Sequence, residues 1–173
     1  MSTRDASPII RTISWRAFNP LEPDPECILI EDIARSLSNL CRYNGHVREF
    51  YSVAEHSFWV SHDVPLKDAL WGLLHDASEA YLGDMMSPLK YHTPLGEHYR
   101  QIEAVVMGAV CQRFNLPPTM PPSVARADHA QLQREHDWLR SVPSRRSLRM
   151  VERTMKPSEA EQEFLNRFQE LTR

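Results

Sequence analysis

The pattern of hydrophobic and polar positions is clearest over residues 69–84, where apolar residues return at helical spacing. The apolar positions are Leu70, Leu73, Leu74, Ala77 and Tyr81. This spacing predicts one apolar face of an α-helix. At about 100° per residue, His75, Asp76 and Glu79 fall together on the opposite face of that helix.

The polar face of this segment has two interpretations. It is either the solvated side of an ordinary amphipathic helix or part of a metal site, because an imidazole beside a carboxylate suits a divalent transition ion. Gly72 and Gly83 lie on the same face, and their missing side chains would let a partner approach closely. A single His-Asp pair does not decide between the two, so the question is whether further ligands stand elsewhere.

Helical periodicity extends through most of the chain, with proline-containing connections between the periodic segments. We expect helices over about 30–40, 52–63, 96–115, 123–140 and 155–172. Ser52 with Glu55 fits a capping box, and Ser123 and Ser158 are further candidate N-caps. Residues 1–26 read as a loosely structured arm, in which 9–15 is either a short strand or an extended segment, and 83–90 as a loop. The expected fold class is therefore all-α, a bundle of about six helices.

The amino-acid composition argues against several kinds of function. The 173 residues are 42% hydrophobic and 25% charged, which is typical of a soluble globular domain. A net charge of -3 argues against bulk-charge binding to nucleic acid or membranes. The three cysteines form no CxxC pair, so neither a cysteine-rich zinc site nor a disulfide framework is indicated. The chain shows neither a long apolar run nor the apolar core of a signal peptide, so we expect a cytoplasmic location.

Two more segments carry candidate ligands on otherwise apolar stripes. His56 stands among Val53, Trp59 and Val60, which fits either a core histidine or an inward-facing metal ligand. Asp128 shares its stripe with Glu135 and with Val124, Leu132 and Leu139. Buried carboxylates are costly unless they are paired or bound to a metal; the alternative is a shifted stripe with both acids at the solvent boundary.

Combined, these residues form a nitrogen- and oxygen-only ligand set on three separate predicted helices. Its members are His56, His75, Asp76 and Asp128. Such a set suits Mn, Fe, Co, Ni or Zn and leaves coordination positions for water and substrate. The sequence therefore predicts one divalent transition metal per site.

The order His…His-Asp…Asp resembles the motif of the HD-domain phosphohydrolases. Residues 51–57 are similar to that family's first-histidine helix, and 126–128 to its final acidic ligand. Residues 75–90 resemble the 5′-deoxynucleotidase branch, especially the small HD hydrolases of phages and prophages. The resemblance covers about residues 29–140. It implies one HD-type domain over 1–173, with the arm at 1–26, a catalytic core at 29–140 and a C-terminal helix at 155–172.

The resemblance also implies roles for single residues. His56, His75, Asp76 and Asp128 would hold the metal, and Glu79 matches the family's acid/base glutamate. Glu79 also lies one turn beyond the His75-Asp76 pair, so helix geometry independently directs it to the same place.

The substrate-binding positions follow from the same resemblance. Arg42 matches the phosphate-binding arginine, Lys90 would be a second phosphate cation, and Asp84 matches the carboxylate that contacts the sugar hydroxyl. Tyr43 stands about where the nucleotidase relatives carry a stacking tryptophan. His46 is close by in the sequence and would line the pocket or stabilise the turn at 44–45.

The expected function is metal-dependent hydrolysis of (deoxy)nucleoside 5′-phosphates, with the monophosphate as substrate. The alternatives are a phage-type dNTP triphosphohydrolase and a non-catalytic HD module that binds a nucleotide or a partner, for which the arm and the basic segment 140–153 are the supporting features. The expected partner is a small-molecule nucleotide rather than nucleic acid or a membrane. We also expect a homo-oligomer, a dimer or larger.

Overall fold

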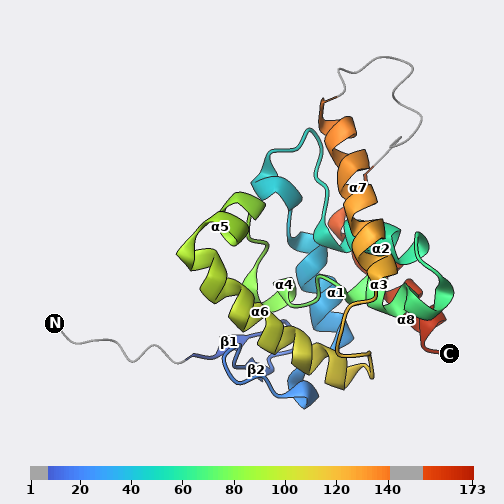
Figure 1. Ribbon diagram of the computed structural model, residues 1–173. Helices are drawn as coiled ribbons and strands as arrows, with labels where there is room; N and C mark the ends of the chain where they lie inside the picture. The colour runs from blue at the N-terminus through green and yellow to red at the C-terminus, as the bar shows by residue number, and fades with distance from the viewer. Residues whose placement is uncertain (1–7, 141–153) are drawn as a thin grey trace.

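The computed structural model describes residues 8–140 and 154–173, and this part of the chain is mostly helical (Figure 1). The helices are α1 Ile30–Asn39, α2 Val53–His62, α3 Ala69–Leu74, α4 Glu79–Leu82, α5 Ser87–His92, α6 Pro94–Arg113, α7 Pro122–Arg140 and α8 Pro157–Leu171. Short 3₁₀ segments cover Pro25–Cys27, Arg42–Gly45 and Leu66–Asp68. The predicted all-α class is confirmed. The basic stretch at 141–153 lies outside the described residues.

The N-terminal segment is more ordered than the irregular arm that the sequence predicts. Strands β1 (Ile10–Arg11) and β2 (Ala17–Phe18) pair antiparallel, with Ile10 opposite Phe18. The Phe18 side chain is 1% exposed and stacks on Tyr81, with ring centroids 4.0 Å apart. This hairpin is therefore fixed to the helical core through an aromatic pair.

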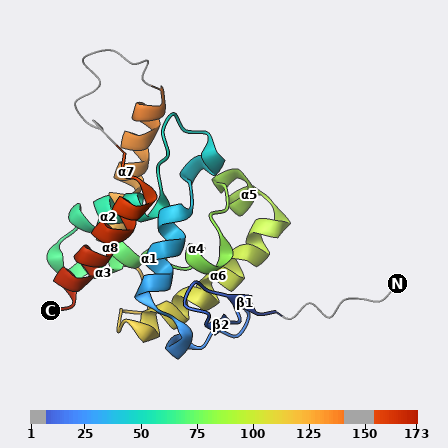
Figure 2. The ribbon, with the colours of Figure 1, turned by 180° about the vertical axis from the view of Figure 1, so that it is seen from behind.

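The core forms where α1, α2, α3 and α8 pack together. Although α8 follows the rest of the fold in sequence, it lies beside α1 and α2 (Figure 2). Fully buried side chains fill the space between these helices: Ile33, Leu37, Val53, Leu73, Leu74 and Phe164. Burial of this apolar surface fixes α2 and α3 side by side; α2 carries His56, and α3 ends directly before His75.

Helices α2 and α3 approach each other closely at Gly72. A Cβ atom at this position would lie 3.1 Å from Cα of Ser61 and 3.3 Å from the carbonyl oxygen of Val60. The prediction that the missing side chain of Gly72 lets a partner approach closely is confirmed, and the partner is α2. Gly83, with φ of +81°, ends α4 in a conformation that favours glycine.

The central segment is not one continuous helix, as the periodicity predicts, but α3 and α4 joined by a tight turn at 75–78. Backbone bonds across this turn join residues only three positions apart: the N–H of Ala77 donates to the carbonyl of Leu74, that of Glu79 to Asp76, and that of Tyr81 to Ser78. Such a 3₁₀ stretch is tighter than an α-helix. It places the His75-Asp76 pair at an interruption in the helix.

Of the three predicted N-caps, one is confirmed and two are wrong. Ser52 does cap α2, accepting a bond from the N–H of Glu55 at 3.0 Å. Ser123 and Ser158 are not N-caps, because Pro122 and Pro157 already begin their helices, as suits proline at a first position.

The predicted loop at 83–90 also differs, because α5 begins inside it, at Ser87. Pro88 is compatible with this helix because it lies in the first turn of α5, where no backbone N–H is required. None of the described helices is long and apolar enough to span a membrane.

Candidate active site

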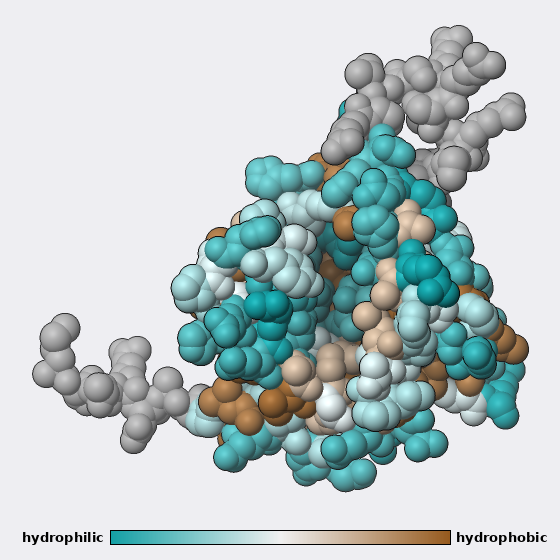
Figure 3. Space-filling view, in the orientation of Figure 1, coloured by the Kyte–Doolittle hydropathy of each residue, from teal (hydrophilic) through white to brown (hydrophobic). Residues whose placement is uncertain are grey.

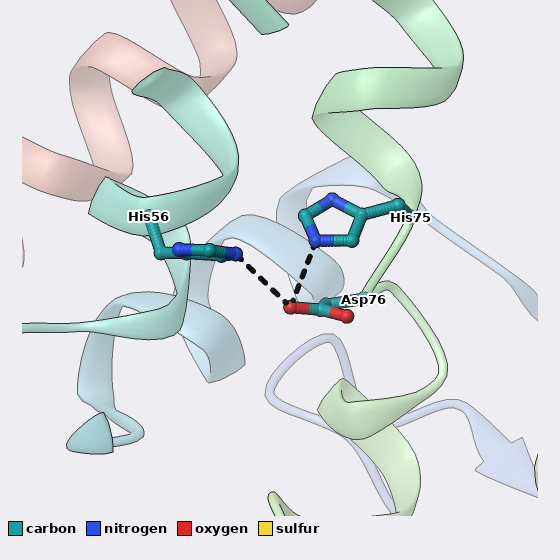
Figure 4. A group of neighbouring side chains, drawn as sticks. All are labelled: His56, His75 and Asp76. Atoms are coloured by element: carbon teal, nitrogen blue, oxygen red, sulfur yellow. Dashed lines mark ion pairs between the residues drawn. The ribbon is translucent and has the colours of Figure 1, made fainter. Parts of the chain in front are cut away.

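Four of the predicted site residues come together from three parts of the chain. His56 comes from α2, His75 and Asp76 from the turn after α3, and Asp128 from α7. Nε2 of His56 lies 3.1 Å from Oδ1 of Asp128 and 3.8 Å from Oδ2 of Asp76. Nε2 of His75 lies 3.1 Å from Oδ2 of Asp76 and 3.9 Å from Oδ1 of Asp128. Figure 4 shows both imidazoles directed at the Asp76 carboxylate.

The turn after α3 sets the orientation of His75. Its Nδ1 lies 2.8 Å from the carbonyl oxygen of Gly72. A carbonyl can only accept, so Nδ1 carries the proton and Nε2 keeps its lone pair. That Nε2 is buried and has no hydrogen-bond partner among the described residues, because its position beside Asp76 lacks hydrogen-bond geometry. A buried lone pair directed at a group of carboxylates is what a metal ligand provides.

His56 is completely buried, yet it is not a core histidine with one satisfied nitrogen. Its Nδ1 lies 2.7 Å from Oε1 of Glu135, and its Nε2 faces Asp128 on the other side of the ring. Both nitrogens therefore meet carboxylates, and the Nε2 side is the one that points to His75 and Asp76 (Figure 4).

Opposite charges dominate the electrostatics of the group. Burial alone would raise the pKa of Asp76, but His75, His56 and Arg42 outweigh it and hold that pKa well below its ordinary value. Burial alone would lower the pKa of His75, but the Asp76 and Asp128 carboxylates raise it to about 9. The carboxylates therefore favour a positive charge at the point where the two imidazoles meet.

Glu79 begins α4 directly beyond this group and is 6% exposed. Burial raises its pKa well above the ordinary value, and the Asp76 and Asp84 carboxylates add to the shift. Its Oε2 has no hydrogen-bond partner among the described residues. A carboxyl group held near its protonated form beside a cluster of charged ligands is suited to proton transfer.

Two predicted cations stand near the acidic residues. Nη1 of Arg42 is 4.0 Å from Oδ2 of Asp76, and its side chain is only 12% exposed. Nζ of Lys90, on α5, is 2.7 Å from Oε1 of Glu103. Burial raises the pKa of Asp84, and both cations counter that shift. Arg42, Lys90 and Asp84 therefore influence one another electrostatically, as expected for groups around a shared pocket.

The surface is hollowed between α5 and α7, with largely hydrophilic residues on both sides (Figure 3). Tyr43 is half-buried, and its ring centroid lies 5.7 Å from that of His136. Its hydroxyl is bonded to Glu135 at 2.5 Å. The side chain of His46 is exposed, and its backbone N–H donates to the carbonyl of Tyr43. The structure thus ties Tyr43 to the group and leaves His46 outside it.

Glu135 is the residue that sequence reasoning missed. It was noted only as a costly acid on the inward stripe of its helix, yet it is 4% exposed and contacts Arg42, Tyr43, Tyr51 and His56. Burial alone would raise its pKa, but His56 and Arg42 hold it at about 2. Its spacing of seven residues from Asp128, two helical turns on one face, was the available signal.

Comparisons with known proteins agree with this geometry. Residues 62–136 match the family described as 5′-deoxynucleotidase YfbR-like. The uncharacterized protein YfdR of Escherichia coli (strain K12) is 34% identical over 174 residues, which span 94% of this chain and 95% of YfdR. The chain belongs to the YfbR-like 5′-deoxynucleotidase family of the HD superfamily. Membership makes it a hydrolase of the HD type.

Two more relatives share parts of this YfbR-like chain. An uncharacterized protein of Rhodobacter capsulatus is 38% identical over 126 residues, 68% of this chain and 63% of that protein. A 5′-deoxynucleotidase of Photobacterium profundum is 48% identical over 40 residues, 22% of this chain and 21% of that protein. The family match includes His75, Asp76 and Asp128, while Arg42 and His56 precede it in the sequence.

Proposed function

We propose that the protein is a metal-dependent 5′-nucleotidase that hydrolyses deoxynucleoside 5′-monophosphates. The observation that carries this proposal is the convergence of two imidazoles and two carboxylates, from residues 56, 75, 76 and 128, on one point. Membership of the YfbR-like family and the deoxynucleotidase named among the relatives support a nucleotide substrate.

The donor set fits a divalent transition metal. His56, His75 and Asp76 each offer a ligand atom, and these atoms lie within 4.8 Å of one another. Oδ1 of Asp128 lies near Nε2 of both imidazoles. Nε2 of His75, which has no hydrogen-bond partner among the described residues, supplies a free lone pair. When bound, a divalent ion supplies Lewis-acid chemistry that activates water and offsets charge on phosphoryl oxygens. Nitrogen and oxygen ligands fit Mn, Co, Fe, Ni and Zn alike.

The chain's own residues would bind the substrate and move a proton. Arg42 and Lys90 would offset the charge of the phosphate group, since guanidinium and ammonium groups form the strongest bonds with such anions. The carboxyl of Glu79 would accept a proton from the attacking water or donate one to the leaving oxygen. Asp84 would accept a hydrogen bond from the sugar hydroxyl, and Tyr43 would contact the base.

A substrate panel tests the proposal and its alternatives. Purified protein is incubated with Mn²⁺ or Co²⁺ and with each deoxynucleoside mono- and triphosphate. We expect free phosphate from the monophosphates and loss of that release in Asp76→Ala. The control variant Asp24→Ala should release phosphate normally, because it removes an exposed carboxylate that is not one of the site residues. Release of triphosphate from a dNTP would instead identify a triphosphohydrolase, and binding without any release would identify a non-catalytic nucleotide-binding module.

Assembly, origin and location stay predictions. We propose a homo-oligomer, a relationship to phage or prophage HD hydrolases, and a cytoplasmic location. Light scattering on the eluting protein tests the first, because a monomer mass of 20.1 kDa would contradict it.

A further inference from the structure

The carboxylate of Glu135 is buried behind the ligand group, and each of its oxygens binds a different set of donors. Oε1 lies 2.7 Å from Nδ1 of His56 and 3.0 Å from the hydroxyl of Tyr51. Oε2 lies 3.1 Å from Nε of Arg42, 3.0 Å from Nη2 of the same guanidinium and 2.5 Å from the hydroxyl of Tyr43. One side chain thus contacts both a candidate metal ligand and a candidate phosphate-binding cation.

The Oε1 contact sets which nitrogen of His56 carries the proton. An ionised carboxylate only accepts hydrogen bonds, so Nδ1 donates and Nε2 is left with its lone pair. This Nε2 is the atom that faces Asp76 and Asp128. His75 is held in the same way, because its Nδ1 donates to the carbonyl oxygen of Gly72.

The Oε2 contacts hold a backbone segment that is otherwise unfavourable. Tyr43 and Asn44 have φ values of 55° and 54°, in the left-handed region, which non-glycine residues rarely adopt because it has an energetic cost. Bonds from the Arg42 guanidinium and the Tyr43 hydroxyl to Glu135 offset part of this cost. They also fix the guanidinium with its Nη1 toward Asp76.

We propose that Glu135 is a positioning residue that prepares both halves of the site with one carboxylate. Oε1 fixes the His56 tautomer that leaves Nε2 free for a metal, and Oε2 fixes the Arg42 guanidinium for a phosphate. Glu135 itself touches neither the metal nor the substrate. The inference rests on the proposed function, because it takes the ligand role of His56 and the phosphate role of Arg42 from it.

A glutamine at this position can accept hydrogen bonds from only one of the two sets of donors, those at His56 or those at Arg42. Its amide has one accepting oxygen, and its NH₂ group donates. The guanidinium cannot become an acceptor, so we expect the amide oxygen of Glu135→Gln to face Arg42. The NH₂ group then meets Nδ1 of His56, which turns the imidazole into the tautomer with its proton on Nε2. That tautomer cannot bind a metal through Nε2.

Calorimetric titration of chelator-treated protein with Mn²⁺ tests this inference. Loss of an outer-shell partner of a metal ligand weakens metal binding by about 10–100-fold, and we expect this loss in Glu135→Gln. The matched control is Glu55→Gln, which replaces another buried glutamate, 2% exposed, whose carboxylate accepts from the backbone N–H of Met155. The control should bind Mn²⁺ within about twofold of the wild type.

A second titration, of inorganic phosphate into the Mn²⁺-loaded proteins, separates the two halves. Glu135→Gln should bind phosphate nearly as well as the wild type, whereas Glu135→Ala removes both oxygens and should weaken both ligands. If the alanine variant does not fold, the isosteric glutamine variant still decides. Unchanged Mn²⁺ affinity in Glu135→Gln would overturn the inference, whereas a wild type that binds no Mn²⁺ would instead overturn the proposed function.

Discussion

The contact of α2 with α3 at Gly72 gives the most specific prediction about how the fold supports the site. Gly72→Ala would place a methyl group 3.1 Å from Cα of Ser61, 3.3 Å from the carbonyl oxygen of Val60 and 3.3 Å from Cγ2 of Val64. The first two neighbours are backbone atoms, which cannot rotate away. The helices must therefore separate by a few tenths of an ångström.

Two opposing effects set the change in the free energy of unfolding that Gly72→Ala causes. Overpacking of this kind costs about 1–3 kcal/mol, while alanine is favoured over glycine in a helix by up to about 1 kcal/mol. Gly108→Ala, in the exposed part of α6, has the second effect without the first, because none of the described atoms lies within 4 Å of its added methyl group. The difference between the two variants therefore isolates the packing cost.

Thermal unfolding of the chelator-treated variants measures that difference. For a chain of this size, 1 kcal/mol corresponds to about 2–4 °C, so Gly72→Ala should melt about 2–12 °C below Gly108→Ala. Since α2 carries His56 and α3 leads to His75, Gly72→Ala should also weaken Mn²⁺ binding, while Gly108→Ala should not. Equal melting temperatures for the two variants would refute this account of the helix contact.

Three further predictions concern single side chains. Because the folded-state pKa of Glu79 is raised, its ionisation destabilises the fold increasingly as the pH rises above about 4.3; chelator-treated Glu79→Gln should therefore melt several degrees above chelator-treated wild type at pH 8 and no higher at pH 4. With Mn²⁺ added back, the variant should release no phosphate, because it lacks the carboxyl that transfers the proton; normal release would contradict that role. Asp32→Asn weakens the bonds from the backbone N–H and the hydroxyl of Ser14; denaturant unfolding should show a loss of about 1–2 kcal/mol with kcat unchanged, and a lower kcat would contradict this. Lys90→Met breaks the pair with Glu103 and should raise KM for a monophosphate at least tenfold in steady-state kinetics, whereas an unchanged KM would remove Lys90 from the phosphate site.

Sequence periodicity predicted most of the helices, though not α5, and the faces they bury, because apolar spacing reports local geometry directly. It could not predict the turn at 75–78. There the imidazole of His75 bonds to the Gly72 carbonyl, and the backbone shifts to three-residue hydrogen bonds. That competition between side chain and backbone leaves no periodic pattern.

The four candidate metal ligands could be predicted from the sequence, but the hydrogen bonds of Glu135 that hold His56 in place could not. The order of His56, His75, Asp76 and Asp128 along the chain suggested that they meet, and they do. Glu135 could be recognised as a costly inward acid, but its partners come from segments about 80–90 positions earlier in the chain. Only the tertiary packing of α7 against α2 identifies which donors satisfy it.

Anomalous scattering from crystals soaked in Mn²⁺ tests the central claim most directly. We predict one strong peak per chain, at about 2.0–2.3 Å from Nε2 of both histidines and from the two aspartates, which is the usual range for such ligands. A saturated crystal with no peak among His56, His75, Asp76 and Asp128, or with its only peak elsewhere, would contradict the account.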